Sequence, residues 1–525
     1  MTDDPRLEAL RTGMVVSYWA AAQPGDPAIV SPHGDRTFAQ LNAGANRLAR
    51  ALRRRGLGAG DAMCLLSANR PEFAEVVAGS QRCGLRLTPL NWHLTGDEAG
   101  YIVADCGATA LIADARFAET ARDAAAAAPG ATVRLSVGGH IEGFDPYDEA
   151  IGPEDGGDID DPVLGTSMLY TSGTTGRPKG VHRPRGATAG AGGAGSAGSV
   201  LASFRAAGDG PSMHLCTGPL YHAAPLAFSL AVPMAQGMGV VLMDGWDAEE
   251  ALRLIERYRI THTHMVPTMF HRLLTLPHEV RARYDTSSLR FVLHGAAPCP
   301  VPIKQAVIDW WGPVVFEYYA ATEGGASFVT SEEWLARPGT VGKPPTDDHV
   351  RVLDDQGAEV APGEVGTIYI KAPKGAEFEY YNDPAKTASA YRSGYFTLGD
   401  VGYLDKDGHL FLTDRSVDLI ISGGVNIYPA EIEAALITHP AVGDVAVIGV
   451  PSGEWGEEVK AVVELQPGRS ASPELEAELT AWCRGRLASF KVPRSVDFTE
   501  ELPRQDNGKL YKQRLREQYR QRVGG

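Results

Sequence analysis

The segment LYTSGTTGRPKGVH, residues 169–182, is the part of the sequence that decides the fold. Leu169 and Tyr170 end a short apolar run, which predicts the end of a β-strand. Small hydroxyl and glycine residues fill positions 171–176, ahead of Lys179. Glycines let the backbone turn so that several N–H groups point to one place, and hydroxyls and a lysine add further donors. The segment therefore predicts a strand that leads into a phosphate-binding loop.

Two familiar phosphate loops do not fit this segment. A Walker loop needs G-x-x-x-x-G-K followed by Ser or Thr, but Gly173 and Gly176 stand only three residues apart and Gly180 follows Lys179. The dinucleotide pattern G-x-G-x-x-G is absent as well. A flexible linker is the weaker interpretation, because linkers seldom combine a strand end, dense hydroxyls and one lysine.

Length and composition are those of an ordinary multidomain protein. At 525 residues the chain exceeds what one hydrophobic core usually serves, so two or more domains are expected. The formal net charge of −16 argues against nucleic acid or an anionic membrane as the main partner. The six cysteines show no C-x-x-C spacing, which favours reduced thiols and a cytoplasmic location.

No segment predicts export or membrane insertion. The N-terminus, MTDDPRLEAL, lacks the basic start and apolar core of a signal peptide. Residues 223–243 carry no charge over about the length of a membrane span, but Pro225 and Pro233 interrupt them. We expect a buried helix there, followed by a buried strand at 239–243, and no transmembrane segment.

The first part of the chain alternates between helical and strand patterns. Thr37 suits a helix N-cap, and the apolar residues that follow recur at helical spacing: Leu41, Ala45, Leu48 and Leu52. A buried strand at 63–66 and a helix at 71–83 come next. This alternation predicts layered α/β structure to about residue 150. The acidic stretch 152–161 predicts a surface connection, and the Gly/Ala/Ser tract 186–199 predicts either a flap or a helix of small residues.

The pattern changes twice more. Asp247 suits the cap of a helix, and strands are expected at 261–266 and 291–293. Short runs between turn pairs at 341–412 predict an antiparallel sheet or small barrel. Beyond this region helix and strand alternate again, with helices starting at 429 and 472 and strands at 445–449 and 459–465. We place a domain boundary near Asp414, which gives an α/β domain of residues 1–413 and a small α+β domain of residues 414–525.

Further motifs follow the first loop in order. They are YYAATE at 318–323, YFTLGD at 395–400, TDRSVD at 413–418 and LPRQDNGK at 502–509. An aromatic ring offers a flat face to a base, and a carboxylate suits Mg²⁺ or the two hydroxyls of a ribose. Each motif alone also has an ordinary interpretation, such as a buried aromatic pair, a turn aspartate or a solvated lysine.

Together the motifs resemble those of the adenylate-forming enzymes, which include acyl-CoA synthetases, peptide-synthetase adenylation domains and firefly luciferase. Residues 171–180 resemble the TSGTTGxPKG signature, and residues 318–323 resemble Y-G-x-T-E. Residues 395–400 resemble Y-x-T-G-D, and residues 503–509 resemble the P-R-x-x-x-G-K ending. The resemblance covers essentially the entire chain, and within the family the chain resembles the bacterial fatty-acyl-CoA synthetases.

The resemblance implies a set of site residues. Catalytic roles fall to Lys179, Thr322, Glu323 and Lys509, and Glu323 also holds Mg²⁺. The residues implied in ATP or AMP binding are Thr171, Ser172, Gly173, Thr174, Thr175, Gly176, Gly295, Ala296, Ala297, Glu317, Tyr318, Tyr319, Asp400 and Arg415. Within this set, Tyr319 stacks on adenine and Asp400 binds the ribose.

The resemblance also implies a moving domain. Asp414 is the hinge, Gly423 and Gly424 pass the pantetheine arm of CoA, and His222 and Gly295 line the acyl pocket. The small domain, which carries Lys509, rotates between the two half-reactions. We expect His262, His264 and His294 to be ordinary core or surface histidines.

Two positions depart from the family pattern. Ala320 replaces the usual glycine of the Y-G-x-T-E motif, which narrows the space beside the nucleotide. Val417 stands where many relatives carry lysine, so a second basic contact is missing.

The implied reaction is activation of a carboxylic acid by ATP and Mg²⁺ to acyl-AMP, with release of pyrophosphate, followed by transfer to CoA. The small apolar residues at 221–228 and 294–300 favour a medium or long acyl chain or a bulky hydrophobic ring system, and an aromatic acid stays open. Two alternatives remain. One is an adenylating enzyme that uses an amine or a carrier-protein thiol as acceptor. The other is an inactive protein that binds acyl-adenylate. The sequence does not indicate an oligomeric state.

Overall fold

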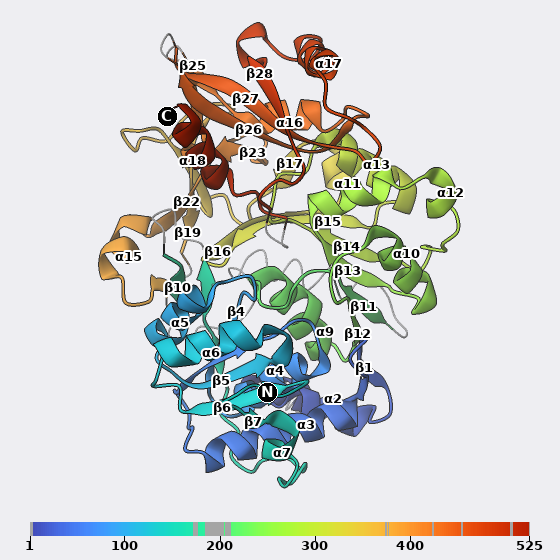
Figure 1. The fold of residues 1–525 in the computed structure, drawn as a ribbon, viewed down its shortest axis with the longest axis vertical. Helices are drawn as coiled ribbons and strands as arrows, with labels where there is room; N and C mark the ends of the chain where they lie inside the picture. Colours follow the sequence, from blue (N-terminus) through green and yellow to red (C-terminus); the bar gives the residue numbers. More distant parts are fainter. Residues whose placement is uncertain are drawn as a thin grey trace.

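The computed structural model describes residues 4–171, 177–183, 204, 212–372, 375, 377–422, 425–452, 455–504 and 508–523. Figure 1 shows a larger body that carries the N-terminus and a smaller one, in orange and red, that carries the C-terminus. We call residues 4–415 the large lobe and residues 416–523 the small lobe. Four sheets belong to the large lobe and one five-stranded sheet to the small lobe.

An eight-stranded sheet forms the centre of the large lobe. Its order is β16-β15-β14-β13-β11-β12-β1-β2, parallel except for the two outermost pairs. The strands are β1 (Pro27–Val30), β2 (Arg36–Thr37), β11 (Met213–Cys216), β12 (Gly239–Leu242), β13 (His262–Met265), β14 (Phe291–His294), β15 (Val315–Ala321) and β16 (Gly324–Val329).

A parallel six-stranded sheet lies beside it, in the order β7-β6-β5-β3-β4-β8. Its strands are β3 (Ala62–Leu66), β4 (Arg86–Leu90), β5 (Ala108–Asp114), β6 (Val133–Val137), β7 (Asp145–Pro146) and β8 (Thr166–Ser167). β3 is buried along its whole length, as a parallel strand covered on both faces must be.

Helices separate and cover these two sheets. One core cluster joins residues of both sheets to the helices between them, α2 (Val15–Ala22), α3 (Phe38–Arg54) and α4 (Pro71–Arg82). In a second core cluster, α5 (Gly96–Asp105) and α6 (Ala118–Ala127) pack on the outer face of the six-stranded sheet. In a third core cluster, α10 (Ala248–Arg257), α11 (Pro267–Thr275) and α13 (Val301–Trp311) pack on the other face of the eight-stranded sheet. The layered α/β arrangement predicted from the sequence is confirmed.

Local sequence signals account for several of these elements. Thr37 caps α3 and forms a capping box with Gln40, and Asp247 caps α10 through the backbone N–H of Glu250. The acidic connection at 152–161 runs along α3, whose Arg50 donates to carbonyl oxygens of Asp155, Gly157 and Asp158. The predicted surface connection is therefore held against the arginine-rich face of α3.

The uncharged stretch 223–243 forms a buried π-helix, η2 (Pro225–Ala231), then α9 (Val232–Ala235) and the buried strand β12. Helix followed by strand agrees with the prediction, although the π-helical winding was not foreseen. Within the described residues, no helix has both the length and the apolar character that a membrane crossing requires.

Antiparallel strands make up the rest of the large lobe. One sheet has the order β17-β23-β22-β19-β18, with β21 paired to β22, and a three-stranded sheet has the order β20-β10-β9. The strands are β9 (Leu169–Thr171), β10 (Lys179–His182), β17 (Thr340–Gly342), β18 (Val350–Leu353), β19 (Gly366–Lys371), β20 (Glu379–Tyr380), β21 (Tyr391–Arg392), β22 (Tyr395–Leu404) and β23 (Leu410–Arg415).

The remaining large-lobe helices are short and lie on the surface or between strands. They are α1 (Pro5–Thr12), η1 (Ala115–Phe117), α7 (Tyr147–Ile151), α12 (His278–Arg281), α14 (Ser331–Ala336) and α15 (Pro384–Ala390).

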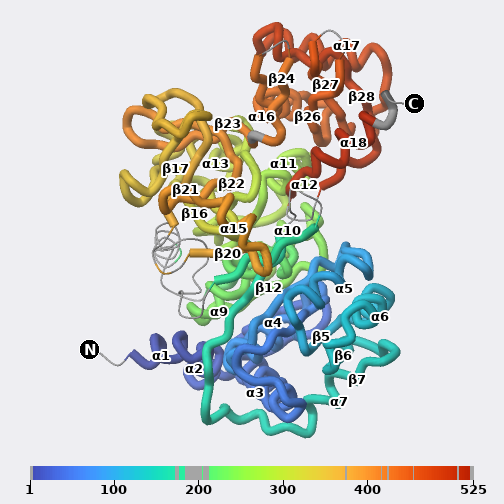
Figure 2. The backbone as a smooth tube through the Cα atoms, turned by 90° about the vertical axis from the view of Figure 1, so that its left-hand side faces the viewer, coloured from blue at the N-terminus to red at the C-terminus, as the bar shows by residue number. Residues whose placement is uncertain are grey.

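The small lobe is a sheet with helices on both faces. Its strands are β24 (Ile420–Ser422), β25 (Val425–Ile427), β26 (Val442–Ser452), β27 (Gly456–Leu465) and β28 (Ser495–Thr499). One face packs on α16 (Pro429–Leu436) and α17 (Pro473–Arg484), and the other packs on α18 (Lys512–Val523). Two short helices, η3 (Ser416–Asp418) and η4 (Ser489–Lys491), complete it. Figure 2 shows the chain ends far apart, the N-terminus by α1 and the C-terminus by α18.

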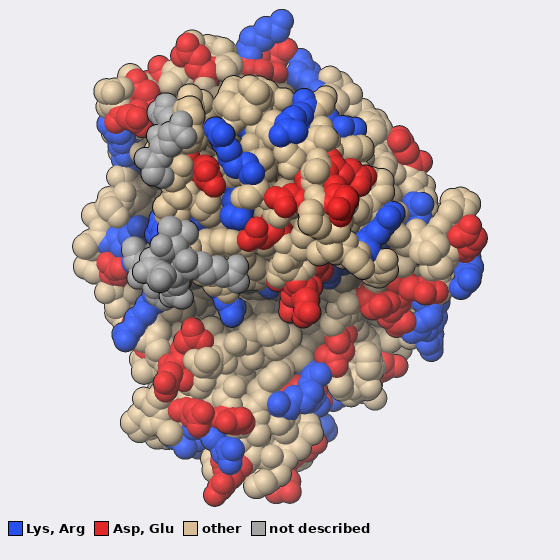
Figure 3. All heavy atoms as spheres, turned by 45° about the horizontal axis from the view of Figure 1, so that its top comes forward, with Lys and Arg blue, Asp and Glu red and all other residues tan. Residues whose placement is uncertain are grey.

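Charged side chains are spread over the surface. On the face in Figure 3, acidic and basic residues are intermixed, and neither sign covers a continuous area.

The predicted boundary at Asp414 lies at the end of β23, where the large-lobe sheets give way to the small-lobe sheet.

Candidate active site

A tight turn between β15 and β16 carries the first group of predicted residues. Thr322 and Glu323 form this turn, and a β-bulge at Tyr319 and Ala320 precedes it. The Arg183 guanidinium donates to the main-chain carbonyls of Thr322 (2.9 Å) and Glu323 (2.7 Å). The Glu323 side chain is almost completely buried. The turn is therefore fixed through its backbone, which leaves its side chains available for function.

Asp400 joins three strands through its two carboxylate oxygens. The Tyr319 hydroxyl on β15 donates to Oδ2 (2.6 Å), and Arg415 Nε on β23 donates to Oδ1 (3.0 Å). Asp400 and Arg415 are also direct partners in the β22–β23 ladder. Burial raises the pKa of the Tyr319 hydroxyl, and Asp400 adds to this rise. The structure thus brings together Tyr319, Asp400 and Arg415, as the sequence predicts for one nucleotide site.

The segment after β14 approaches the same hairpin. A Cβ atom on Gly295 would stand 2.7 Å from the Tyr318 ring, so only glycine allows this contact. The Tyr318 hydroxyl and His264 Nε2 lie 3.0 Å apart. Ala296 adopts a left-handed backbone conformation with φ of 70°, which costs an alanine roughly 1–2 kcal/mol. Strain of this kind often marks a functional loop.

Glu317 lies on the same strand but within the protein interior. Its Oε2 is 2.6 Å from Lys304 Nζ on α13, and both side chains are buried. Burial raises the pKa of Glu317, while Lys304 acts against the rise. The Glu317 carboxylate is therefore engaged by Lys304 in the protein interior.

Lys179 stands in a strand and not in a loop. It begins β10 and pairs with Thr171 of β9. Its ammonium lies 2.8 Å from Asp383 Oδ2, at the start of α15. The predicted residues Ser172, Gly173, Thr174, Thr175 and Gly176 lie outside the described residues, as do Gly423, Gly424 and the tract 186–199.

Lys509 is the contribution of the small lobe. Burial lowers its pKa to about 8, and the nearby Arg415 acts in the same direction. Asp400, Glu323 and Asp418 are near enough to act in the opposite direction. The lysine therefore lies among the charged residues of the large lobe that the sequence predicts for ATP and Mg²⁺.

Close packing seats this part of the small lobe on α11. Gly508 has φ of 79°, and a Cβ there would stand 2.9 Å from both Thr268 Oγ1 and Val266 Cγ2. His271 of α11 is also buried against the small lobe. Burial lowers its pKa, while Asp444 and the main chain of Val442 and Gly443 oppose this effect.

His222 lies near enough to Lys509 to feel its charge. Burial lowers the pKa of His222 to about 3, and the positive charges of Lys509 and His93 add to the effect. Among the described residues its buried Nε2 has no hydrogen-bond partner. The imidazole is therefore neutral at physiological pH, and Nε2 can donate or accept according to its tautomer. Three further histidines that the sequence analysis considered, His262, His264 and His294, are buried core residues, as expected.

Asp414 connects the two lobes. Its Oδ1 accepts from the backbone N–H of Arg415 (2.7 Å), and its Oδ2 accepts from that of Ala430 in the first turn of α16 (2.9 Å). Burial raises its pKa, and Lys512 opposes the rise. The predicted hinge residue thus also caps a small-lobe helix.

Comparison with known proteins identifies the family. The model of the AMP-binding enzymes matches residues 16–381, and that of the AMP-binding enzyme C-terminal domain matches residues 431–509. The chain belongs to the adenylate-forming enzymes. Asp414 falls between the two matched segments.

Three similar adenylate-forming proteins illustrate the range of the family. A feruloyl-CoA synthase of Amycolatopsis sp. is 36% identical over 92% of this chain and 94% of its own. The fatty acid–acyl-carrier-protein ligase ScoC of Streptomyces coeruleorubidus is 33% identical over 98% and 97%. The structure of the amide bond synthetase McbA from Marinactinospora thermotolerans has a TM-score of 0.79 at 29% identity, covering 96% of this chain and 99% of that one.

Several residues around the site were missed by sequence reasoning. They are Arg183, Lys304, Tyr380 and Asp383. Asp383 precedes Pro384 and caps α15, so the Asn-Asp-Pro sequence could have predicted its role as a cap. Nothing local predicts its pairing with Lys179, which lies 204 residues away in sequence.

The residues present fit Mg²⁺ bound mainly by substrate. Within the described ranges no cluster of three or more metal-ligating side chains occurs. Glu323 offers a buried carboxylate whose Oε1 accepts from the Tyr380 hydroxyl (3.0 Å). Mg²⁺ is commonly bound by one or two carboxylates together with substrate phosphates and water, and such a site matches this single carboxylate.

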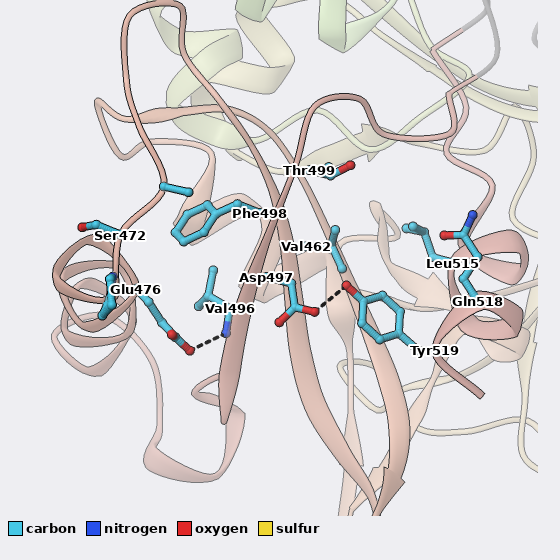
Figure 4. A pocket seen from close by; sticks show the side chains of 12 residues that line it. Val462, Ser472, Glu476, Val496, Asp497, Phe498, Thr499, Leu515, Gln518 and Tyr519 are labelled. Carbon is cyan, nitrogen blue, oxygen red and sulfur yellow. Dashed lines mark hydrogen bonds between the residues drawn. The ribbon is translucent and has the colours of Figure 1, made fainter. Parts of the chain in front are cut away.

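A separate pocket of about 540 Å³ opens on the small lobe. Figure 4 shows it between α17, β28 and α18, where the Tyr519 hydroxyl bonds Asp497 (2.7 Å) and Glu476 bonds the Val496 N–H (3.1 Å). None of the predicted site residues lines this pocket.

Proposed function

We propose that this chain is an acyl-CoA ligase, which activates a carboxylic acid to acyl-AMP and then transfers the acyl group to CoA. One observation carries the proposal: Lys509 of the small lobe lies among Glu323, Asp400, Arg415 and His222 of the large lobe. A cation placed there can bridge two anionic reactants that otherwise repel each other, the carboxylate of the acid and the α-phosphate of ATP.

The large lobe binds the nucleotide in this proposal. Tyr319 stacks on adenine, and Asp400, held by Tyr319 and Arg415, accepts from the ribose hydroxyls. A carboxylate has about four lone-pair positions, so two protein donors leave room for two hydroxyls. Gly295, Ala296 and Ala297 line the adenine, and the hydroxyl and glycine motif at 171–176 is assigned to the phosphates on its sequence.

Electrostatic stabilisation supplies most of the rate enhancement. Two opposite unit charges ~4 Å apart attract by about 4 kcal/mol at an effective dielectric constant near 20, against about 1 kcal/mol in water. Lys509 uses this attraction to hold the carboxylate in line with the α-phosphate. Lys179 and the backbone of the loop bind the pyrophosphate that leaves, and Thr322 donates to a phosphate.

Glu323 is the residue that would hold Mg²⁺, which supplies charge neutralisation for the phosphates when bound. Tyr380 orients the carboxylate of Glu323, and Arg183 fixes its main chain.

Release of pyrophosphate is followed by rotation of the small lobe. The family motifs assign Lys509 to the first half-reaction and Gly423 and Gly424 to the second, so in this proposal the lobe turns about Asp414 between them. The CoA thiol then reaches the acyl-AMP past Gly423 and Gly424.

We infer that the acid has a hydrophobic body, either a medium or long chain or a bulky ring system. Phe228, Tyr318 and their neighbours form an apolar cluster beside the Gly295 segment. Ferulate and a fatty acid, the acids in the names of two relatives, both have such a body.

A second acceptor class has specific support. ScoC and McbA are named for a carrier-protein acceptor and for amide bond formation, and this chain matches each over nearly its whole length. An amine or a carrier-protein thiol is therefore the alternative to CoA.

Pyrophosphate release tests the first half-reaction. Purified protein with ATP and Mg²⁺ is supplied with ferulate, decanoate, palmitate or a bulky ring acid, and each rate is compared with that of the Lys509→Ala variant. We expect at least one acid to release pyrophosphate at a rate that falls about 10²–10³-fold in the variant. No release with any acid would support an inactive acyl-adenylate-binding protein.

The acceptor is tested with the best acid. Its synthetic acyl-AMP is mixed with CoA, with a panel of amines or with a phosphopantetheinylated carrier protein, and the products are identified by mass spectrometry. We expect acyl-CoA as the main product. If an amide or an acyl-carrier protein is the main product instead, the acceptor is an amine or a carrier-protein thiol and not CoA.

A further inference from the structure

Arg504 makes three side-chain hydrogen bonds just before Lys509 in the chain. Its Nε and Nη2 bind the two carboxylate oxygens of Asp444, the second at 2.7 Å from Oδ1. Its Nη1 donates to the carbonyl oxygen of Gly508 at 2.7 Å. This carbonyl belongs to the peptide bond whose N–H is that of Lys509. One planar guanidinium therefore ties the backbone beside Lys509 to β26.

Backbone contacts also join the two ends of the chain segment that carries Lys509. Arg504 forms a β-bridge with Leu510, and the backbone N–H of Tyr511 donates to the carbonyl of Pro503 (2.8 Å). These contacts hold the entry and exit of the segment together, while Arg504 Nη1 reaches the Gly508 carbonyl between them. Residues 505–507 lie outside the described residues.

Asp444 places this arrangement against the large lobe. Its Oδ1 also accepts from the Val445 N–H (2.7 Å), which orients the carboxylate at the start of β26. His271 of α11 is buried beside Asp444, and Gly508 packs on Val266 and Thr268 just before it. Thr268 and His271 of α11 thus lie near the two ends of the Arg504 bridge, Gly508 and Asp444 respectively.

Partial burial makes the bridge effective. The Arg504 side chain is 20% exposed and that of Asp444 is 12% exposed. A bidentate Arg–carboxylate pair is short and directional, and it loses little strength to water where it is shielded. Lysine cannot make all three bonds at once, because an ammonium is a point charge without the planar fork.

We propose that Arg504 is a positioning residue of the adenylation half-reaction: it holds the Gly508 carbonyl so that the Lys509 side chain enters the site at a fixed angle. This inference rests on the proposed function, which gives Lys509 its role in acyl-AMP formation. Arg504 acts only through Lys509, so it has no part in thioester formation, when the small lobe has turned away.

The test measures the two half-reactions separately. Arg504→Met and Arg504→Lys are compared with wild type for pyrophosphate release with the best acid, and for acyl-CoA formation from its synthetic acyl-AMP. For Arg504→Met we expect pyrophosphate release to fall at least 30-fold, mainly in kcat, and acyl-CoA formation to stay within about threefold. Arg504→Lys recovers part of the loss, because a cation can reach Asp444 or the carbonyl but not both.

A double variant separates positioning from general damage. If Arg504 acts through Lys509, Arg504→Met combined with Lys509→Ala is no slower in pyrophosphate release than Lys509→Ala alone, since residues that act as a unit are not additive. Lys460→Met is the matched control, because it removes another small-lobe ion pair, to Asp497 at 2.8 Å, away from the Lys509 segment. It should leave both half-reactions near the wild-type rates.

Each outcome decides between the two proposals. A wild type that releases no pyrophosphate with any acid overturns the proposed function and the role of Arg504 together. An active wild type whose Arg504→Met variant keeps its pyrophosphate rate, or loses both half-reactions equally, overturns the role of Arg504 alone. If Arg504→Met does not fold, Arg504→Lys with an unchanged melting temperature provides the same comparison.

Discussion

The two halves of the candidate site are held in different ways. The large-lobe half is built from neighbouring strands, and Asp400 joins β15, β22 and β23 through direct hydrogen bonds. The small-lobe half is Lys509, which follows Gly508 in the chain, and Gly508 packs on Thr268 of α11 while its carbonyl accepts from Arg504. The difference teaches that, in the proposed mechanism, nucleotide binding is built into one lobe, whereas the charge for the first chemical step is brought by docking of the other.

The largest expected effect comes from removing the docked charge. Lys509→Ala should lower acyl-AMP formation about 10²–10³-fold and leave thioester formation from supplied acyl-AMP unchanged. Pyrophosphate release and acyl-CoA formation measure the two steps, with Lys406→Ala, an exposed lysine of the β22–β23 turn, as control. Equal loss of activity in both half-reactions would show that Lys509 acts in both of them, which contradicts a lysine that leaves the site before thioester formation.

Asp400→Asn tests the built-in half. The amide keeps the shape but loses the negative charge that Tyr319 and Arg415 share, so we expect the KM for ATP to rise about 10- to 100-fold. Because acyl-AMP carries the same ribose, thioester formation from acyl-AMP should suffer as well. Initial rates of both half-reactions measure the effect. A loss of activity confined to adenylation would contradict the role of Asp400 as a ribose ligand in both half-reactions.

The pH profile sharpens the comparison further. Lys509 is charged below its pKa of about 8 and neutral above it, so kcat/KM for adenylation should decline above about pH 8, approaching tenfold per pH unit. Thioester formation does not use Lys509 and should lack this decline. Lys509→Arg, which stays charged, should move the decline beyond the measured range, and a decline unchanged in that variant would assign it to another group.

The smallest expected effect concerns Lys179 and Asp383. Their ion pair competes with the triphosphate for the lysine, so Asp383→Asn should lower the KM for ATP by no more than about fivefold. Asparagine keeps the capping of α15, which makes it a better choice than alanine. Lys179→Met should instead raise the KM, and changes of the same sign in both variants would rule out this competition.

Local signals explain what the sequence predicted well. Helix caps such as Thr37 and Asp247 act within four residues, and the periodicity of α3 and β3 reflects the face that each buries. The family motifs placed Tyr319, Asp400, Arg415 and Lys509 in one site, and the structure brings them together.

The sequence did not predict pairs of residues that come from distant segments of the chain. The position of Lys179 in a strand depends on pairing of β10 with β9 and β20, and its partner Asp383 comes from a distant segment. The family resemblance gives Glu317 to the nucleotide site, and it does not predict that Lys304 on α13 engages the Glu317 carboxylate. Such pairs depend on how elements pack, which no motif records.

The capping of α16 by Asp414 would add a free-energy cost to rotation of the small lobe. If the hinge opens at this residue, the Oδ2 bond to the Ala430 N–H must stretch or break, and a lost helix cap of this kind costs about 1 kcal/mol. That amount shifts a two-state population about fivefold. The cap would thus bias the lobes toward the arrangement that keeps Lys509 near Glu323 and Asp400, and ligands of the second step would have to overcome this bias.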